Sequence, residues 1–451
     1  MSDIIAAIAT GRAPCAIGIL RLSGPGCAAL TGRVFTPEQP FADAPDRRLV
    51  LGLLHDRQGR VIDECLGVVC RAPHSYTGEE TVELQCHGSP AMLAAGLEAL
   101  LAAGARQAGP GEFTRRAFLN GKLDLTQAEA VVDLIDAETA DAAANAAGQL
   151  GGALKRAIGP VYGGLTDLCS HFHAVLDYPD EDIEDFGAAE LSGALDRAGA
   201  ALQELLATYE KGRHLRQGVR AVLLGKPNAG KSSLLNRLAG YDRVIVTDIA
   251  GTTRDTVEEP VRVGRVLLRL TDTAGIREAG DAIEALGVAR SEQAAREAEL
   301  ALFVCDASQP LTDEDRRAIE AAKCAPRSLA LCNKSDLPAA VSPDELPFDT
   351  VLTVSARTGA GLDALPALLE GWFLGENACD GSLLTNPRQF GALDRASSAI
   401  ERAKTGLSLG VTPDAVLTDV EEAMAALGEV TGRTVREDIT NRIFERFCVG
   451  K

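Results

Sequence analysis

Residues 225 to 232 read Gly-Lys-Pro-Asn-Ala-Gly-Lys-Ser, a complete phosphate-binding loop of the form G-x-x-x-x-G-K-[ST]. The loop follows the apolar run 220–224, which predicts a buried strand, and precedes residues 232–239, whose leucines have helical spacing. Its glycines would let backbone N–H groups face phosphate oxygens, Lys231 would contact the β- and γ-phosphates, and the Ser232 hydroxyl would reach Mg²⁺. The stretch therefore predicts an α/β domain that binds a nucleotide.

Further nucleotide-site motifs follow in the order typical of guanine-nucleotide hydrolases. Asp272 ends an apolar run, where its carboxylate can hold Mg²⁺ through water while the Gly275 amide meets the γ-phosphate. Asp336 can accept hydrogen bonds from both N1–H and N2–H of guanine, a pattern that adenine cannot offer. A glycine-rich turn without a ligand would explain the first loop alone, but not this ordered set: Thr252 and Thr253; Asp272-Thr273-Ala274-Gly275; Asn333-Lys334-Ser335-Asp336; Ser355-Ala356-Arg357.

The residues around the base-binding aspartate have supporting roles in this interpretation. Asn333 and Lys334 would brace the loop and cover the base. The backbone amides of Ser355, Ala356 and Arg357, which follow another apolar run, would face guanine O6. The complete series predicts a domain that binds and hydrolyses GTP.

One residue of the hydrolytic site is missing from the expected position. Ile276 follows Gly275, where many small GTPases have a glutamine that orients the attacking water, so another residue must do this. Asn228 has a carboxamide oxygen that could coordinate a monovalent cation between the phosphates, and such a cation could replace the charge of an arginine finger. From the residues alone, this role and a simple hydrogen bond within the loop are equally supported.

Longer stretches extend the pattern over the whole chain. Three of them are Gly-Lys-Pro-Asn-Ala-Gly-Lys-Ser-Ser at 225–233, Asp-Thr-Ala-Gly-Ile-Arg-Glu at 272–278 and the terminal Phe-Cys-Val-Gly-Lys at 447–451. The others lie at 18–24, 110–125 and 247–255. These stretches resemble the MnmE family of tRNA-modification GTPases, also called TrmE. The terminal motif is especially discriminating, because a generic GTPase has no reason to end in this way.

The resemblance implies the roles of individual residues in the GTP site. K⁺ would be held by Asn228, Thr247, Ile249 and Thr252, and Mg²⁺ by Ser232 and Thr253. Glu284 matches the acidic residue that orients the hydrolytic water in the family and would act with Lys231; from the residues alone, it looks like a solvated helix start. The full set implied to contact GTP is Asn228, Ala229, Gly230, Lys231, Ser232, Ser233, Thr247, Asp248, Ile249, Ala250, Gly251, Thr252, Thr253, Asp272, Thr273, Ala274, Gly275, Asn333, Lys334, Asp336, Ser355, Ala356 and Arg357.

The resemblance also implies a tetrahydrofolate site in the N-terminal part of the chain. A 5,10-methylene or 5-formyl derivative would be bound by residues that otherwise look like ordinary strand-end or loop charges. Cationic side chains would suit the glutamate tail and a carboxylate would suit the pterin. Cys448 is either a small structural hydrophobe or a thiol delivered by a mobile tail, and the family resemblance favours a catalytic thiol. The implied folate residues are Arg21, Glu83, Lys122 and Lys451.

Composition is consistent with a large cytoplasmic protein. At 451 residues, the chain should contain about two or three domains, and its apolar content of 46% is ample for their cores. We find no run of about 18 apolar residues and no signal peptide, so we expect no membrane association. The 11 cysteines lack C-x-x-C pairs, which favours reduced thiols in the cytoplasm.

The patterns divide the chain into a multidomain α/β protein. Residues 1–118 mix strand-like runs with a helix near 92–103, which predicts an α+β domain, and the family resemblance assigns it folate binding and dimerisation. Alanine-rich helical spacing over 119–215 returns over 377–451, so we expect these two parts to form a central helical bundle. Residues 216–376 alternate strands and helices and predict an inserted Ras-like P-loop GTPase domain.

The family resemblance implies a homodimeric, K⁺-stimulated GTPase that works with a flavoprotein of the MnmG type, which binds FAD, in a heterotetramer or larger complex. Together they would add a carboxymethylaminomethyl or aminomethyl group to C5 of the wobble uridine of certain tRNAs. The net charge of −19 and the absence of a basic run suggest that the partner holds most of the tRNA. A ribosome-assembly GTPase is the alternative, but it predicts a basic RNA-binding module. A non-catalytic scaffold would need a broken phosphate loop, and this loop is intact.

Overall fold

The computed structural model divides the chain into two compact units. The first contains Met1–Val132, Gln149–Leu195 and Ser398–Lys451, and the second contains Asp133–Gly148 and Asp196–Ser397. The four domain boundaries expected from the sequence remain predictions. The residues that the structure describes are 3–11, 13–38, 44–177, 188–241, 258–272, 292–375, 380–434, 443–445 and 447–450.

The N-terminal part of the first unit is built on a seven-stranded sheet with the order β3-β4-β5-β6-β2-β1-β7. Neighbouring strands are antiparallel except for β1 and β7, which run parallel. The strands expected near 16–20, 66–70 and 81–84 are confirmed. The bounds are β1 Ile5–Ile8, β2 Cys15–Ser23, β3 Phe35–Pro37, β4 Val50–His55, β5 Val61–Cys70, β6 Thr81–Gly88 and β7 Arg106–Gln107.

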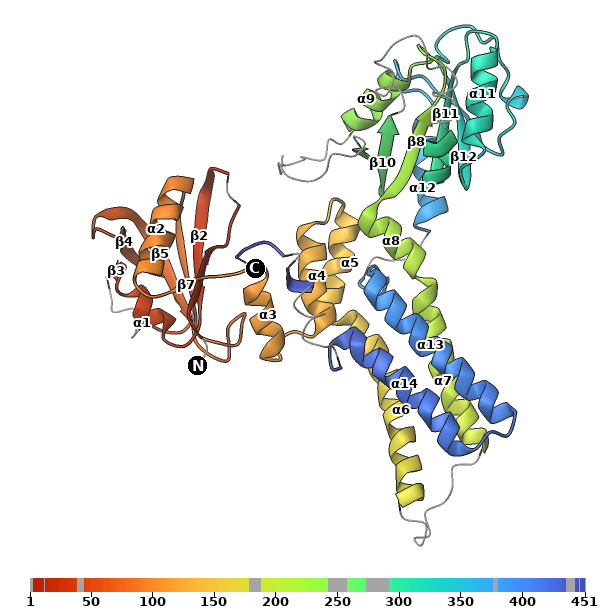
Figure 1. The fold of residues 1–451 in the computed structure, drawn as a ribbon. Coiled ribbons are helices and arrows are strands. Elements are labelled where there is room, and N and C mark those ends of the chain that lie inside the picture. Colours follow the sequence, from red (N-terminus) through yellow and green to blue (C-terminus); the bar gives the residue numbers. More distant parts are fainter. Residues whose placement is uncertain are drawn as a thin grey trace. The chain divides into compact units, whose positions relative to one another are not determined.

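One face of this sheet packs against two helices, and Phe113 packs against Ile5 and Ala7 of β1 on the other face. Helix α1 (Cys27–Thr31) and the expected helix α2 (Pro90–Ala102) lie along the sheet (Figure 1). Both contribute to a core in which Leu93 and Leu100 of α2 pack with strand residues such as Leu84. On the opposite face, Leu51 of β4 lies directly across from Leu66 of β5, and these side chains are 39% and 36% exposed. An antiparallel sheet with one solvated face normally has polar residues there, so this apolar pair needs a separate explanation.

Helices make up the rest of the first unit, as their alanine-rich sequence predicts. In α6, which contacts α14, the Cys169 Sγ lies 3.4 Å from the Met424 Sδ, and the Arg433 guanidinium lies 4.7 Å from the Tyr162 ring centroid. Their cores contain mostly alanine, leucine and valine. The bounds are α3 Glu112–Leu119, α4 Leu125–Ile135, α5 Ala140–Leu150, α6 Ala153–Asp177 and α14 Pro413–Thr431, of which α4 and α5 extend across the boundary between the units.

The second unit contains a six-stranded sheet with the order β13-β12-β11-β8-β10-β9, in which only β9 is antiparallel to its neighbour. Strand β11 is buried over its whole length. Its Leu300, Leu302 and Val304 belong to one hydrophobic core, while Ala301 and Phe303 belong to another. The sheet is therefore covered on both faces, which explains why its strands read as continuous apolar runs. The bounds are β8 Val219–Leu224, β9 Glu258–Val263, β10 Val266–Asp272, β11 Leu300–Asp306, β12 Arg327–Asn333 and β13 Val351–Thr353.

Because residues of β11 alternate between two cores, helices pack on both faces of the sheet. Leu234 of α9 and Leu365 of α12 belong to the first core, and Ile319 of α11 belongs to the second. Within the described residues, no helix is both long enough and apolar enough to cross a membrane. The bounds are α7 Ala188–Ala207, α8 Tyr209–Gln217, α9 Lys231–Tyr241, α11 Asp313–Ala322, η3 Pro343–Glu345, α12 Ala364–Phe373 and α13 Pro387–Ser408, of which α7 and α13 extend across the boundary between the units.

Ion pairs join the six-stranded sheet to the helical segment 133–148 of the same unit. Arg216, at the end of α8, lies 2.8 Å from Asp133. Arg265 and Arg269, from the β9–β10 hairpin, form ion pairs with Asp141 and Glu138. Each pair links residues more than eighty positions apart in the chain, so these charges orient the segment against the sheet.

Two helical glycines of this unit are predicted to respond oppositely to alanine. A Cβ on Gly212 of α8 would lie 2.2 Å from the Leu384 carbonyl oxygen, whereas a Cβ on Gly371 of α12 would meet nothing within 4 Å. We expect Gly212→Ala to destabilise the unit by about 1–3 kcal/mol through overpacking. Gly371→Ala should stabilise it by about 0.5–1 kcal/mol through helix propensity. Urea unfolding midpoints of both variants test this, and a shift of the same sign in both would contradict the close approach at Gly212.

Candidate functional site

The phosphate-binding loop joins β8 to α9, as the sequence predicts. Its lysine, Lys231, is 8% exposed, and its Nζ donates to the carbonyl oxygens of Gly225 at 2.7 Å and Lys226 at 2.8 Å. Because Lys231 is the first residue of α9, the ammonium lies at the positive end of a helix. The charge is thus held over the loop, where it can meet an anion.

Backbone geometry explains the two glycines of the loop. Gly225 and Gly230 have φ values of 146° and 95°, which L side chains rarely adopt. A Cβ would also lie 2.1 Å from the Val304 carbonyl oxygen at Gly225, and 2.2 Å from the Asn333 Nδ2 at Gly230. Any larger residue at either position would therefore deform the loop.

Four further residues in and just after the loop differ in their exposure to solvent. Asn228 has a left-handed backbone with φ of 62°, and it is exposed. Ser232 and Ser233, in the first turn of α9, are also exposed, whereas Ala229 is fully buried. Short polar side chains such as asparagine tolerate the left-handed conformation better than most residues, which is the local reason for an asparagine in this turn.

Asn333 connects the phosphate-binding loop to the loop at Ser355. Its Nδ2 donates to the Ala229 carbonyl oxygen at 2.9 Å, and its Oδ1 accepts from the Ala356 N–H at 2.9 Å. Asn333 itself is 1% exposed; its bond to Ala229 is buried and its bond from Ala356 is partly buried. One buried carboxamide therefore couples the phosphate end of the site to the expected base end.

Asp336 is held at the expected base end by two partners. The Ser355 hydroxyl donates to its Oδ1 at 2.5 Å, and Arg357 forms an ion pair with its Oδ2. The hydrogen bond from Ser355 and the nearby charge of Arg357 lower the pKa of Asp336 below its ordinary value. The carboxylate is therefore ionised at neutral pH, as an acceptor for two N–H groups must be.

Sequence reasoning missed two acidic residues that position lysines of the site. Asp306, at the end of β11, lies 2.6 Å from the Lys334 Nζ, and Lys334 has a φ of 65°. Asp315, which is fully buried, lies 3.0 Å from the Lys226 Nζ. The sequence does offer a sign of the role of Asp306, because this residue ends a continuous apolar run, as Asn333 does. The two runs form the neighbouring strands β11 and β12. The ends of adjacent parallel strands meet at one edge of the sheet.

Part of the expected GTP site lies outside the described residues. This holds for the segment that contributes Thr247, Asp248, Ile249, Ala250, Gly251, Thr252 and Thr253, for Thr273, Ala274 and Gly275, and for Glu284. Asp272 is the last residue of β10, beside β8. Its backbone therefore ends at the edge of the sheet where the phosphate-binding loop begins.

The residues expected to bind folate belong to the first unit. Arg21 of β2 lies directly across from Glu83 of β6, and the Arg21 Nε is 2.7 Å from the Glu83 Oε1. The Arg21 guanidinium lies 5.7 Å from the Tyr76 ring centroid and 5.8 Å from the Phe113 ring centroid. Lys122 instead donates to the Pro73 carbonyl oxygen at 3.1 Å, and Lys451 lies outside the described residues.

The C-terminal tail lies against this part of the first unit. Val449 forms a β-bridge with Pro110, and the Gly111 N–H donates to the Cys448 carbonyl oxygen at 3.3 Å. The Gly450 carbonyl oxygen accepts from the Arg21 Nη1 at 3.4 Å. The Cys448 side chain is exposed, so the tail fixes its backbone and leaves its thiol accessible to solvent.

Phe444 and Phe447 anchor the tail. They are 2% and 6% exposed and pack with Ala128 and Val131 of α4. The tilted ring contact between the two phenylalanines has a centroid distance of 5.2 Å. Burial of two aromatic rings stabilises the docked tail by several kcal/mol, on the order of 1.5–3 kcal/mol for each ring.

Two family models together match most of the chain. A model of the TrmE N-terminus of GTP-binding proteins matches residues 4–122, and a model of the MnmE helical domain matches residues 125–448. A solved structure, the G domain of the T. maritima FeoB iron transporter, is 22% identical over 33% of this chain and 94% of that chain, with a TM-score of 0.25.

Relatives cover the full length of the chain. A tRNA modification GTPase MnmE from Roseiflexus sp. is 45% identical, and the alignment covers 100% of this chain and 99% of the relative. Another, from Aquifex aeolicus, is 41% identical, with 100% of both chains covered. Since family models match both ends of the chain and such identity extends along all of it, the chain belongs to the MnmE family of tRNA modification GTPases.

Proposed function

We propose that this GTPase hydrolyses GTP in a K⁺-stimulated reaction and modifies tRNA together with a flavoprotein of the MnmG type. The pair would add a carboxymethylaminomethyl or aminomethyl group to C5 of the wobble uridine of certain tRNAs. The one-carbon unit would come from a tetrahydrofolate derivative. The observation that carries this proposal is family membership over the full length, combined with a phosphate-binding loop whose lysine and glycines have the geometry for an anion.

The donor set of the loop fits the two cations. Ser232 offers an exposed hydroxyl at the start of α9, and Mg²⁺ prefers such oxygen ligands. Thr253 would be the second Mg²⁺ ligand. The exposed, left-handed Asn228 suits K⁺, with Thr247, Ile249 and Thr252 completing its site. When bound, K⁺ would supply the positive charge that stabilises the transferring phosphoryl group, in place of an arginine finger.

The chain's own residues would then perform hydrolysis. Lys231 would move from the loop carbonyls onto the β- and γ-phosphate oxygens, since an ammonium has a stronger partner in an anion than in a carbonyl. Glu284 would orient the attacking water. Asp336 would accept from the guanine N1–H and N2–H while Asn333 holds its loop against the phosphate-binding loop.

The Arg21–Glu83 pair supports a folate site in the first unit. A cation near the Tyr76 and Phe113 rings, paired with a carboxylate, would suit the charged tail and the flat, hydrogen-bonding pterin of a folate. Lys122 and Lys451 would add positive charge for the glutamate tail. The docked tail would bring the exposed Cys448 to this domain, where its thiol would act in the modification step.

Assembly is proposed on the basis of surface composition. The exposed Leu51 and Leu66 pair across neighbouring strands on the sheet face opposite α1 and α2, which supports a homodimer through this domain. The net charge of −19 supports a partner that holds most of the tRNA. Free thiols throughout the described part of the chain support a cytoplasmic location. The full-length relatives are named for tRNA modification, which disfavours the ribosome-assembly alternative.

Hydrolysis should depend on K⁺ through Asn228. We expect GTP turnover in KCl to exceed that in NaCl at equal ionic strength by about tenfold or more, because one well-placed charge stabilises a transition state by several kcal/mol. Asn228→Ala should lose this stimulation. Asn236→Ala, which changes the same residue type on the exposed surface of α9, is the control. Equal rates in the two salts, or stimulation retained in Asn228→Ala, would refute the role.

Base preference should change in Asp336→Asn. The amide can donate to the 2-oxo group of xanthine but cannot accept from two N–H groups, so we expect a shift from GTP toward XTP. A charge-assisted hydrogen bond contributes about 1.5–3 kcal/mol, which corresponds to a loss of GTP affinity of about tenfold or more. Competition binding with GTP and XTP measures this, with Asp344→Asn in η3 as the control. Unaltered discrimination would mean that Asp336 does not contact the base.

Modification and GTP hydrolysis should separate in Cys448→Ser. Serine keeps the shape but is not ionised near neutral pH, so the thiol chemistry should be lost while K⁺-stimulated hydrolysis stays near normal. Cys15→Ser, which removes another exposed thiol of the same unit, is the control. Nucleoside analysis of tRNA from cells that carry each variant as the only copy is compared with turnover of the purified proteins. Normal modified uridine in Cys448→Ser would make Cys448 a packing residue.

A further inference from the structure

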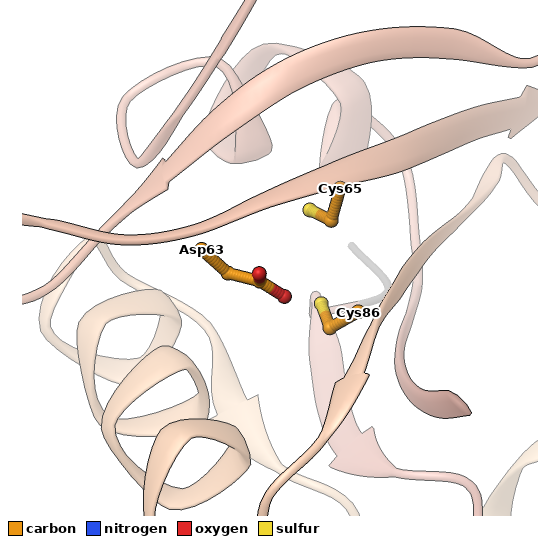
Figure 2. A group of neighbouring side chains, drawn as sticks. All are labelled: Asp63, Cys65 and Cys86. Carbon is orange, nitrogen blue, oxygen red and sulfur yellow. The ribbon is translucent and has the colours of Figure 1, made fainter. Parts of the chain in front are cut away.

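Three side chains of metal-binding types converge beside the core of the N-terminal sheet, in the unit that does not contain the phosphate-binding loop. They are Asp63 and Cys65 of β5 and Cys86 of β6, and their carboxylate and thiol atoms all lie within 4.8 Å of one another. Figure 2 shows the two sulfur atoms and the carboxylate directed toward the same space between the strands. Among the described residues, no other group of three or more such side chains gathers in this way.

The strand register explains the convergence. Leu66 pairs with Gln85, so the next positions, Cys65 and Cys86, lie opposite each other across β5 and β6. Asp63 is two residues from Cys65 and therefore lies on the same face of the strand. This face packs against the core that includes α2, which is why Cys65 and Cys86 are 4% and 3% exposed.

A carboxylate is costly to bury beside this apolar core unless it has partners. The Asp63 side chain is 8% exposed; its Oδ2 accepts from the His87 N–H at 2.8 Å, and its Oδ1 lies 2.7 Å from the His87 Nδ1. These contacts fix the carboxylate orientation without using all of its lone pairs. Outer contacts of this kind commonly orient metal ligands in proteins.

We propose that Asp63, Cys65 and Cys86 bind a zinc ion, with water in the fourth position. Two thiolates and one carboxylate are ligands that zinc accepts, whereas Mg²⁺ and Ca²⁺ avoid sulfur. Around a tetrahedral zinc with Zn–S bonds of about 2.3 Å, sulfur ligands lie about 3.8 Å apart. Donor atoms that are already within 4.8 Å would have to approach by about 1 Å at most, which side-chain rotation can supply.

A bound zinc would give the Asp63 carboxylate a counter-charge beside the apolar core. The Arg21–Glu83 pair uses the opposite face of β6, since Glu83 and Cys86 are separated by an odd number of positions. The zinc would therefore fasten β5 to β6 without contacting the folate residues.

Titration of the tag-free, reduced, full-length chain with Co²⁺ and Zn²⁺ in the absence of nucleotide tests the site. We expect one Co²⁺ per chain with a thiolate-to-cobalt charge-transfer band, which an oxygen-only Mg²⁺ site would not give, and displacement of that band by Zn²⁺. Competition with a chromophoric chelator should show at least about hundredfold weaker zinc binding in Cys65→Ser and Cys86→Ser, and about ten- to hundredfold weaker binding in Asp63→Asn. Cys70→Ser, on the same strand but the opposite face, should bind like the unaltered chain.

The outcomes are decisive in either direction. A band that persists in Cys65→Ser, or the absence of stoichiometric binding in the unaltered chain, would overturn the proposal. A disulfide between Cys65 and Cys86 found by mass spectrometry in place of the metal would also overturn it. Circular dichroism and GTP turnover verify folding of each variant. Should the serine variants not fold, Asp63→Asn, which keeps both thiols, decides: it supports the site if it loses zinc-dependent thermal stabilisation and refutes it if that stabilisation is unchanged.

Discussion

The Asn333 carboxamide is the interaction on which the nucleotide site depends. It spans from the Ala229 carbonyl to the Ala356 amide, and so it fixes the distance between the loop that would hold phosphates and the loop that would hold the base. The bond to Ala229 is buried and the bond from Ala356 is partly buried, so replacing the amide would leave at least the buried Ala229 carbonyl without this partner, at a cost of about 1–3 kcal/mol. The close approach of Gly230 to the same Nδ2 shows why the loop has no room for a side chain there.

Sequence reasoning predicted the elements of this domain because its chemistry is local. The phosphate-binding loop, the strands before it and before Asn333, and the helix after Lys231 all depend on short patterns of glycine, apolar runs and helical spacing, and each is found where it was expected. Asp306 and Asp315 were missed because their roles depend on which lysine lies opposite in space. The ion pairs of Arg265 and Arg269 with the helical segment were missed for the same reason.

The N-terminal domain shows the opposite case. Arg21 and Glu83 are separated by 62 positions and look ordinary in sequence, yet the register of β2 and β6 places them face to face. Asp63, Cys65 and Cys86 are brought together in the same way by β5 and β6. Antiparallel pairing joins residues that no local pattern connects, so a site built on cross-strand neighbours is hidden from single-sequence reasoning. Only family resemblance pointed to Arg21 and Glu83, and nothing pointed to the cysteine pair.

The C-terminal tail is held against the first unit by both backbone and side-chain contacts. Its bridge to Pro110 is short, so the buried rings of Phe444 and Phe447, rather than backbone pairing, must supply most of the docking energy. Gly111 permits this, because a Cβ there would lie 2.8 Å from the Phe444 carbonyl oxygen and from the Phe447 Cβ. Gly450 likewise has a φ of 103° and no room for a Cβ beside the Ile8 carbonyl oxygen. The backbone of Cys448 is therefore held by the buried Phe447 before it and by close contacts at Gly111 and Gly450, while its thiol stays exposed. A fixed backbone with an accessible side chain is the arrangement expected of a reactive group.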